Sequence, residues 1–175
     1  MEFLEQVSDP RLVELYRYWD GLRQGRLAPR RADLCPSHVP QLLPHLMLVE
    51  VVAEEGRERY RYRLVRTEIE HNFGVSMTGR CIDELMRGEY LAFIEGLYRT
   101  LVAEAVPVYS ENVYDAAQSG FDAYPETFRT SRLMLPLSDD GMRVDRVLAG
   151  QVFTRRSRGG THTVFVTQER FRKAS

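Results

Sequence analysis

The sequence predicts an α+β protein built on an antiparallel sheet of five strands, with helices on one face and an extra N-terminal helix. Residues 46–65 contain an apolar run and an alternating segment, which are typical of a β-hairpin. Short helical segments follow, and then further extended segments. No strand alternates regularly with a helix, and this order favours an antiparallel rather than a parallel sheet.

The N-terminal segment, from Asp9 to about Arg26, reads as an amphipathic helix. Ser8 or Asp9 can cap it, Pro10 suits its first position, and Gly25 marks its end. Its apolar residues fall on one stripe: Leu12, Leu15, Trp19 and Leu22. This stripe has two interpretations. It covers the domain's own sheet, or it forms a dimer seam and the output surface.

A connector rich in proline follows this helix. Pro29, Pro36, Pro40 and Pro44 exclude a long helix, because each removes a backbone donor and restrains the preceding residue. The predicted organisation is therefore an N-terminal helix at 1–28, a connector at 29–45, a folded domain at 46–167 and a polar tail at 168–175.

Within the connector, Arg31 and Asp33 are predicted to form a polar clamp. The guanidinium of Arg31 would satisfy carbonyls left open by the prolines, and Asp33 would cap the turn at Pro36. Contact with a ligand is the alternative role for this pair.

The predicted hairpin joins a strand at 46–53, buried on both faces, to an alternating strand. Tyr60, Tyr62 and Leu64 would face the core. The other face would carry four arginines: Arg57, Arg59, Arg61 and Arg63. Acidic residues across the hairpin (Glu50, Glu54 and Glu55) can pair with them, so this stripe is interpreted as a paired surface and not as a nucleic-acid site.

The remaining elements follow from the same patterns. Helices are expected at 67–73, 82–86 and 89–104, the first of them ending at Gly74. Strands are expected at 106–113, 127–137, 146–154 and 161–166, with a hairpin turn at Asp139-Asp140-Gly141.

The bulk composition narrows the class of protein. A net charge of −1 argues against a nucleic-acid binder, and no apolar stretch is long enough to span a membrane. The acidic N-terminus is unlike a signal peptide, so a cytoplasmic location is expected. The two cysteines, Cys35 and Cys81, are then expected to be free thiols.

The order of elements, together with several local motifs, resembles the PAS domain. The segment from Arg63 to Gly74, followed by Met77-Thr-Gly-Arg80, is similar to the PAS stretch in which a helix ends at a glycine. Further motifs resemble a bacterial subfamily of small stand-alone PAS proteins: Trp19, Arg23, Pro29-x-Arg31-Ala-Asp33, Pro36, Leu42-Leu-Pro44 and Leu135-Pro-Leu137. Arg66 and Cys35 depart from this pattern, where glycine and aspartate are common.

This resemblance implies a pocket between the sheet and the short helices. The side chains expected to face it are Tyr62, Phe73, Met86, Phe93, Met134 and Phe153. Such residues either line a ligand cavity or simply fill the core.

No cofactor is assigned from the sequence. His71, the histidine in the helical half, is flanked by Glu68 and Glu70 and is expected to be exposed, which disfavours haem. Cys81 lacks the neighbours of a flavin-linked cysteine, and the histidines and cysteines have no zinc spacing. No nucleophile–base pair or phosphate loop is visible, so catalysis is not expected.

The sequence therefore predicts a sensory or regulatory PAS-like domain in bacterial signal transduction. It would bind a small ligand, a protein signalling partner, or both, without catalysis, and it would form a homodimer. The alternative is a ligand-free adaptor for protein–protein interaction with a filled core.

Overall fold

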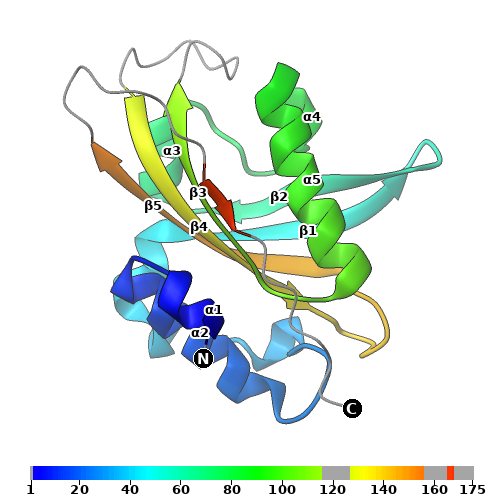
Figure 1. Ribbon diagram of the computed structural model, residues 1–175. Helices are drawn as coiled ribbons and strands as arrows, with labels where there is room; N and C mark the ends of the chain where they lie inside the picture. The colour runs from blue at the N-terminus through cyan, green and yellow to red at the C-terminus, as the bar shows by residue number, and fades with distance from the viewer. Residues whose placement is uncertain (1, 116–126, 156–164, 168–175) are drawn as a thin grey trace.

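The computed structural model describes residues 2–115, 127–155 and 165–167, and its centre is one antiparallel sheet (Figure 1). The sheet has six strands in the order β2-β1-β5-β4-β3-β6. The strands are β1 (Leu46–Glu54), β2 (Arg57–Val65), β3 (Val108–Asp115), β4 (Thr127–Leu137), β5 (Arg146–Arg155) and β6 (Phe165–Thr167). The five strands of the predicted sheet are confirmed, and the further strand expected at 161–166 is described over Phe165–Thr167 as the edge strand β6. The polar tail at 168–175 lies outside the described residues.

Helices cover both faces of this sheet (Figure 1). One face carries α3 (Thr67–Phe73), α4 (Ile82–Leu85) and α5 (Gly88–Glu104), as predicted. The opposite face carries the extra N-terminal segment, with α1 (Glu2–Gln6) and α2 (Pro10–Arg23). The connector adds three 3-10 turns: η1 (Arg31–Asp33), η2 (Pro36–His38) and η3 (Pro40–His45). None of the described helices is both long and apolar enough to cross a membrane.

Local sequence signals explain where α2 and α3 begin and end. The side chain of Asp9 caps α2 by accepting a hydrogen bond of 2.9 Å from the backbone N–H of Arg11. The helix ends where Gln24 adopts a left-handed conformation, at φ +48°, one residue before the predicted stop. Gly74 ends α3 in the same way, at φ +68°.

Two apolar cores result, one on each face of the sheet. The helix-side core lies between the sheet and α3–α5, and it includes Val49, Tyr62 and Leu97. The N-terminal core lies between the sheet and α1–α2, and it includes Leu12, Trp19 and Leu135. Side chains alternate along each strand, so neighbouring residues of β3, β4 and β5 enter different cores. The sheet is therefore the shared wall of both cores.

A β-bulge in β2 changes one predicted orientation. Leu48 pairs with Leu64 whereas the next residue, Val49, pairs with Tyr62, so Arg63 is an extra residue in the ladder. Tyr60 and Tyr62 are buried as predicted, but Leu64 is turned away from them and is 38% exposed. The prediction that Leu64 faces the same core as the two tyrosines is wrong, because the bulge reverses the alternation.

The apolar stripe on α2 packs against the protein's own sheet. Leu12, Leu15 and Trp19 are buried in the N-terminal core, and Leu22 is half-buried. The indole Nε1–H of Trp19 donates a hydrogen bond of 2.8 Å to the carbonyl of Pro136 in β4. This packing favours the interpretation that the stripe covers the domain's own sheet, and a dimer that used these residues would first have to detach α2 from the sheet.

Candidate functional site

The apolar residues predicted to line a pocket do come together, in the helix-side core. Tyr62, Phe73, Met86 and Met134 are buried, whereas Phe93 and Phe153 are half-buried. The ring of Phe153 meets that of Phe73 edge-on, with a centroid distance of 5.5 Å. These apolar side chains surround the candidate site.

A row of polar residues crosses the sheet inside this same core. Ser110 in β3 pairs with Arg132 in β4, which in turn pairs with Gln151 in β5. Their exposed fractions are 1%, 3% and 0%. The Nε–H of Arg132 donates to Oε1 of Gln151 at 2.9 Å, and its Nη2 donates to the hydroxyl of Tyr90 in α5 at 3.2 Å. We call Ser110, Arg132 and Gln151 the polar row.

Each member of the polar row keeps one polar atom without a partner. Ser110 Oγ, Arg132 Nη1 and Gln151 Nε2 are buried and make no hydrogen bond in the described part of the chain. Buried polar groups normally have partners, because an unmade hydrogen bond leaves the cost of desolvation uncompensated. Three such atoms lie on adjacent strands, and they make the polar row the candidate site.

The row also carries a charge that the described residues do not neutralise. Within the described ranges, Arg132 forms no ion pair with a carboxylate. The ionisable neighbours of its guanidinium are the phenols of Tyr62, Tyr90 and Tyr98. Burial raises the pKa of Tyr62 and of Tyr98, so both are uncharged at neutral pH. An arginine stays protonated in proteins, and this one is a buried cation without a counter-ion among them.

The neighbouring rows do not share this property. On one side, Val108, Met134 and Ala149 pair across the same three strands and form an apolar row. On the other side, Thr130 donates to the side-chain oxygen of Asn112 at 2.8 Å. Among these three neighbouring rows of the described sheet, unpartnered side-chain atoms therefore occur in the polar row alone; the other two such atoms, His45 Nδ1 and Arg66 Nε, belong to the connector and the start of α3.

The polar row escaped the sequence prediction for a physical reason. Along β4, Arg129 to Arg132 form an unbroken polar run, which normally indicates a side that faces solvent. Here both faces of the sheet are covered, so the polar side is buried as well. Met134 and Phe153, each two residues from the row, were the nearest predicted site residues.

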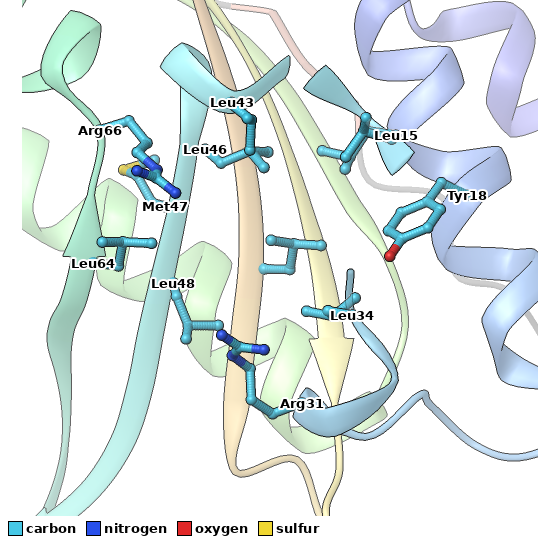
Figure 2. A pocket seen from close by; sticks show the side chains of 12 residues that line it. Leu15, Tyr18, Arg31, Leu34, Leu43, Leu46, Met47, Leu48, Leu64 and Arg66 are labelled. Carbon is cyan, nitrogen blue, oxygen red and sulfur yellow. The ribbon is translucent and has the colours of Figure 1, made fainter. Parts of the chain in front are cut away.

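A small cavity lies on the opposite face of the sheet, between the connector, α2 and strands β1, β2 and β5 (Figure 2). Its volume is about 50 Å³, and leucines provide most of its lining. Arg31 and Arg66 also line it, and Figure 2 shows Arg31 reaching from the connector toward Leu48. We call this space the connector pocket. It shares Arg31 and Leu48 with a more open groove of about 490 Å³.

The predicted clamp in the connector is built differently. Asp33 accepts hydrogen bonds from the backbone N–H of Arg30 at 2.9 Å and from Nη2 of Arg26 at 2.7 Å. These bonds lower the pKa of Asp33, the backbone bond most strongly. Arg26 also donates to the carbonyls of Leu22 and Arg23. The prediction that Arg31 is the clamping arginine and that Asp33 caps the turn at Pro36 is therefore wrong.

The arginines of β2 are paired with acidic side chains. Arg59 contacts Glu54 and Asp83, each at 2.7 Å, and Arg61 contacts Glu54. Arg57 pairs with Asp83 at 2.9 Å, and the hydrogen bonds from Arg59 lower the pKa of Asp83. The predicted pairing across the hairpin is confirmed for Glu54 and for Glu50, which Arg63 contacts at 3.8 Å, and α4 supplies Asp83 as a further partner.

The cysteines considered as cofactor or metal ligands are free thiols. Cys81 is buried at the start of α4, where its backbone N–H donates to Glu84 at 2.9 Å. Both cysteines are free, as predicted. Over the residues that the structure describes, no group of histidine, cysteine and acidic side chains has the arrangement of a metal site.

Comparison with known proteins gives a family match. A family model described as PAS domain matches residues 7–150. This range includes α2, the connector and strands β1 to β4, together with the first half of β5. No curated protein sequence matches the chain.

Several solved structures are similar to the chain, including the following three. A substituted form of RsLOV has 18% identity and a TM-score of 0.47, covering 66% of this chain and 63% of that one, which is less than two thirds of its length. The LOV domain of a blue-light-activated histidine kinase from Erythrobacter litoralis has 19% identity, coverages of 64% and 96%, and a TM-score of 0.45. The Rhodobacter sphaeroides LOV protein has 14% identity, coverages of 71% and 71%, and a TM-score of 0.45.

Proposed function

The chain belongs to the PAS domain family, and on that premise we propose that it is a sensory domain of bacterial signal transduction that binds a small ligand without catalysis. The observation that carries the proposal is the polar row, with three unpartnered polar atoms inside a largely apolar core. A small molecule at the row would make the missing hydrogen bonds. The half-buried side chains of Tyr90, Phe93 and Phe153 border this region and are the proposed route to it.

The same strands offer a way to pass on the signal. In β3, Ser110 belongs to the polar row, whereas the adjacent Tyr109 lies in the other core and contacts Ser8 with its hydroxyl. In β5, Gln151 follows Gly150, which lies directly against Leu12 and Leu15 of α2. A ligand that shifts β3 or β5 would therefore change how the N-terminal segment packs. We propose this segment as the output element, with a homodimer or a protein partner as its target.

Two measurements test this function. Native mass spectrometry of the protein purified from its own host should find a retained small molecule, and denaturation should release that molecule. Trp19, the single tryptophan of the chain, reports on the packing of α2, so addition of the released compound should change its fluorescence. A clean apo mass together with unchanged emission upon addition of host extract would contradict ligand sensing.

The connector pocket favours a second candidate function, a ligand-free adaptor. It is a small apolar pocket with Arg31 and Arg66 beside it, neither of them in an ion pair within the described residues. Substituting Leu64→Glu at its rim would then abolish capture of a host protein while leaving small-molecule retention unchanged. If retention is lost and capture persists, the adaptor hypothesis fails.

A further inference from the structure

The polar row has a net positive charge, and every unpartnered atom in it can donate a hydrogen bond. Arg132 is 3% exposed, and it already uses Nε and Nη2 on Gln151 and Tyr90. The unpartnered atoms are its Nη1, the amide Nε2 of Gln151 and the hydroxyl Oγ of Ser110. Each of them carries hydrogen that it can donate.

From this arrangement we propose that the ligand of the helix-side core is an anion, and that its carboxylate or phosphate oxygens bind the polar row. This inference rests on the proposed ligand-sensing function and specifies the chemical class of the ligand.

The charge of Arg132 is the reason to expect an anion and not water alone. A buried ion is costly unless it is paired and hydrogen-bonded. A water molecule would accept a hydrogen bond from Nη1 but would leave the charge uncompensated. A carboxylate or phosphate oxygen accepts the same bond and also neutralises the guanidinium.

The neighbouring rows indicate what the rest of the ligand is like. Val108, Met134 and Ala149 form an apolar wall on one side of the row. Phe153, two residues beyond Gln151 on β5, and Tyr90 are half-buried on the way to the surface. An acid with a small apolar or aromatic body fits these surroundings better than a polar, sugar-like acid does.

The matched variants are Arg132→Met and Arg129→Met. Both remove one arginine from β4, but Arg129 is an exposed residue that pairs with Glu111, and its side chain lies outside the row. Thermal unfolding of the full chain is followed at constant ionic strength with benzoate, phenyl phosphate and the neutral benzamide. Saturating anion should raise the Tm of the wild-type protein and of Arg129→Met by about 5 °C. It should leave the Tm of Arg132→Met unchanged, and benzamide should shift none of the three.

Each outcome has a defined meaning. A shift with benzoate alone assigns a carboxylate, and one with phenyl phosphate alone assigns a phosphate. Equal shifts in the wild-type protein and Arg132→Met, or no shift with either anion at millimolar concentration, overturn the proposal. Should Arg132→Met fail to fold, Gln151→Leu replaces it, with an expected loss of anion affinity of about tenfold.

Native mass spectrometry tests the anion proposal separately from the proposed ligand-sensing function. If the host protein retains a neutral molecule, ligand sensing stands and the anion proposal fails. If it retains nothing and neither anion binds, both fail.

Discussion

Gly150 provides a sharp test of how the N-terminal helix packs on the sheet. A Cβ atom at this position would lie 2.7 Å from a methyl carbon of Leu15 and 2.8 Å from one of Leu12. Carbon atoms prefer separations of about 3.5–4.0 Å, so the helix or its side chains would have to move. Both leucines are 0% exposed, so they have no open space into which to move. We therefore expect Gly150→Ala to destabilise the protein by about 1–3 kcal/mol.

The size of the effect depends on Leu15, which makes the reasoning testable by a double-mutant cycle. Leu15→Ala alone should cost about 2–5 kcal/mol, because it leaves a cavity in the N-terminal core. In that background the new methyl of Gly150→Ala enters the vacated space. Its cost should then fall by at least about 1 kcal/mol. It can even become favourable, since alanine loses less entropy than glycine on folding.

Urea unfolding, followed by circular dichroism and by Trp19 fluorescence, measures all four members of this cycle. Gly21→Ala serves as a control, because a Cβ on this exposed helical glycine would meet nothing within 4 Å. It should stabilise the protein by about 0.5–1 kcal/mol and show no coupling to Leu15→Ala. Additive energies for Gly150→Ala and Leu15→Ala would refute the packing of α2 on β5.

Three further predictions concern single side chains. Asp33→Ala should lower the Tm by several degrees at pH 7, and the loss should shrink as the pH falls below 3.8, because the pKa of Asp33 is lowered in the folded state. Burial, aided by Arg11, lowers the pKa of His45 below 6.5. Stability should therefore fall as the pH drops through 6.5 toward that lowered pKa, and urea titrations should find a flatter profile for His45→Gln. Trp19→Phe removes the hydrogen bond to the Pro136 carbonyl and should cost about 1–3 kcal/mol in thermal or urea unfolding; an unchanged midpoint would contradict this contact.

Much of the fold followed from local pattern. Residues 67–73 form a helix with the predicted bounds, because Gly74 adopts the left-handed conformation that ends it. The hairpin of β1 and β2 likewise followed from alternation across a glycine-containing turn. Such signals lie within a few residues of the structure they determine, so one sequence is enough to read them.

The errors came from interactions between distant segments. The bulge at Arg63 depends on how β2 meets β1, and it turns Leu64 toward the connector pocket against the simple alternation. Arg26, not Arg31, reaches Asp33, because the chain turns after α2 and brings them together. Neither the bulge nor the Arg26–Asp33 contact can be predicted from the spacing of residues along the sequence.

One part of the candidate site could be predicted from the sequence and the other could not. Apolar residues such as Met134 and Phe153 were predictable from the resemblance to PAS domains. The polar row was not, because the burial of Arg132 depends on α5 covering one face of a sheet whose other face is also covered. Only the assembled sheet puts Ser110, Arg132 and Gln151 side by side.

A crystal structure of the protein purified from its own host tests the central claim most directly. We expect non-protein density between the sheet and residues 67–104, within hydrogen-bond distance of Arg132 Nη1, Gln151 Nε2 and Ser110 Oγ. That result would establish a ligand site on the polar row. A core in which protein groups or water alone satisfy these three atoms would contradict the account.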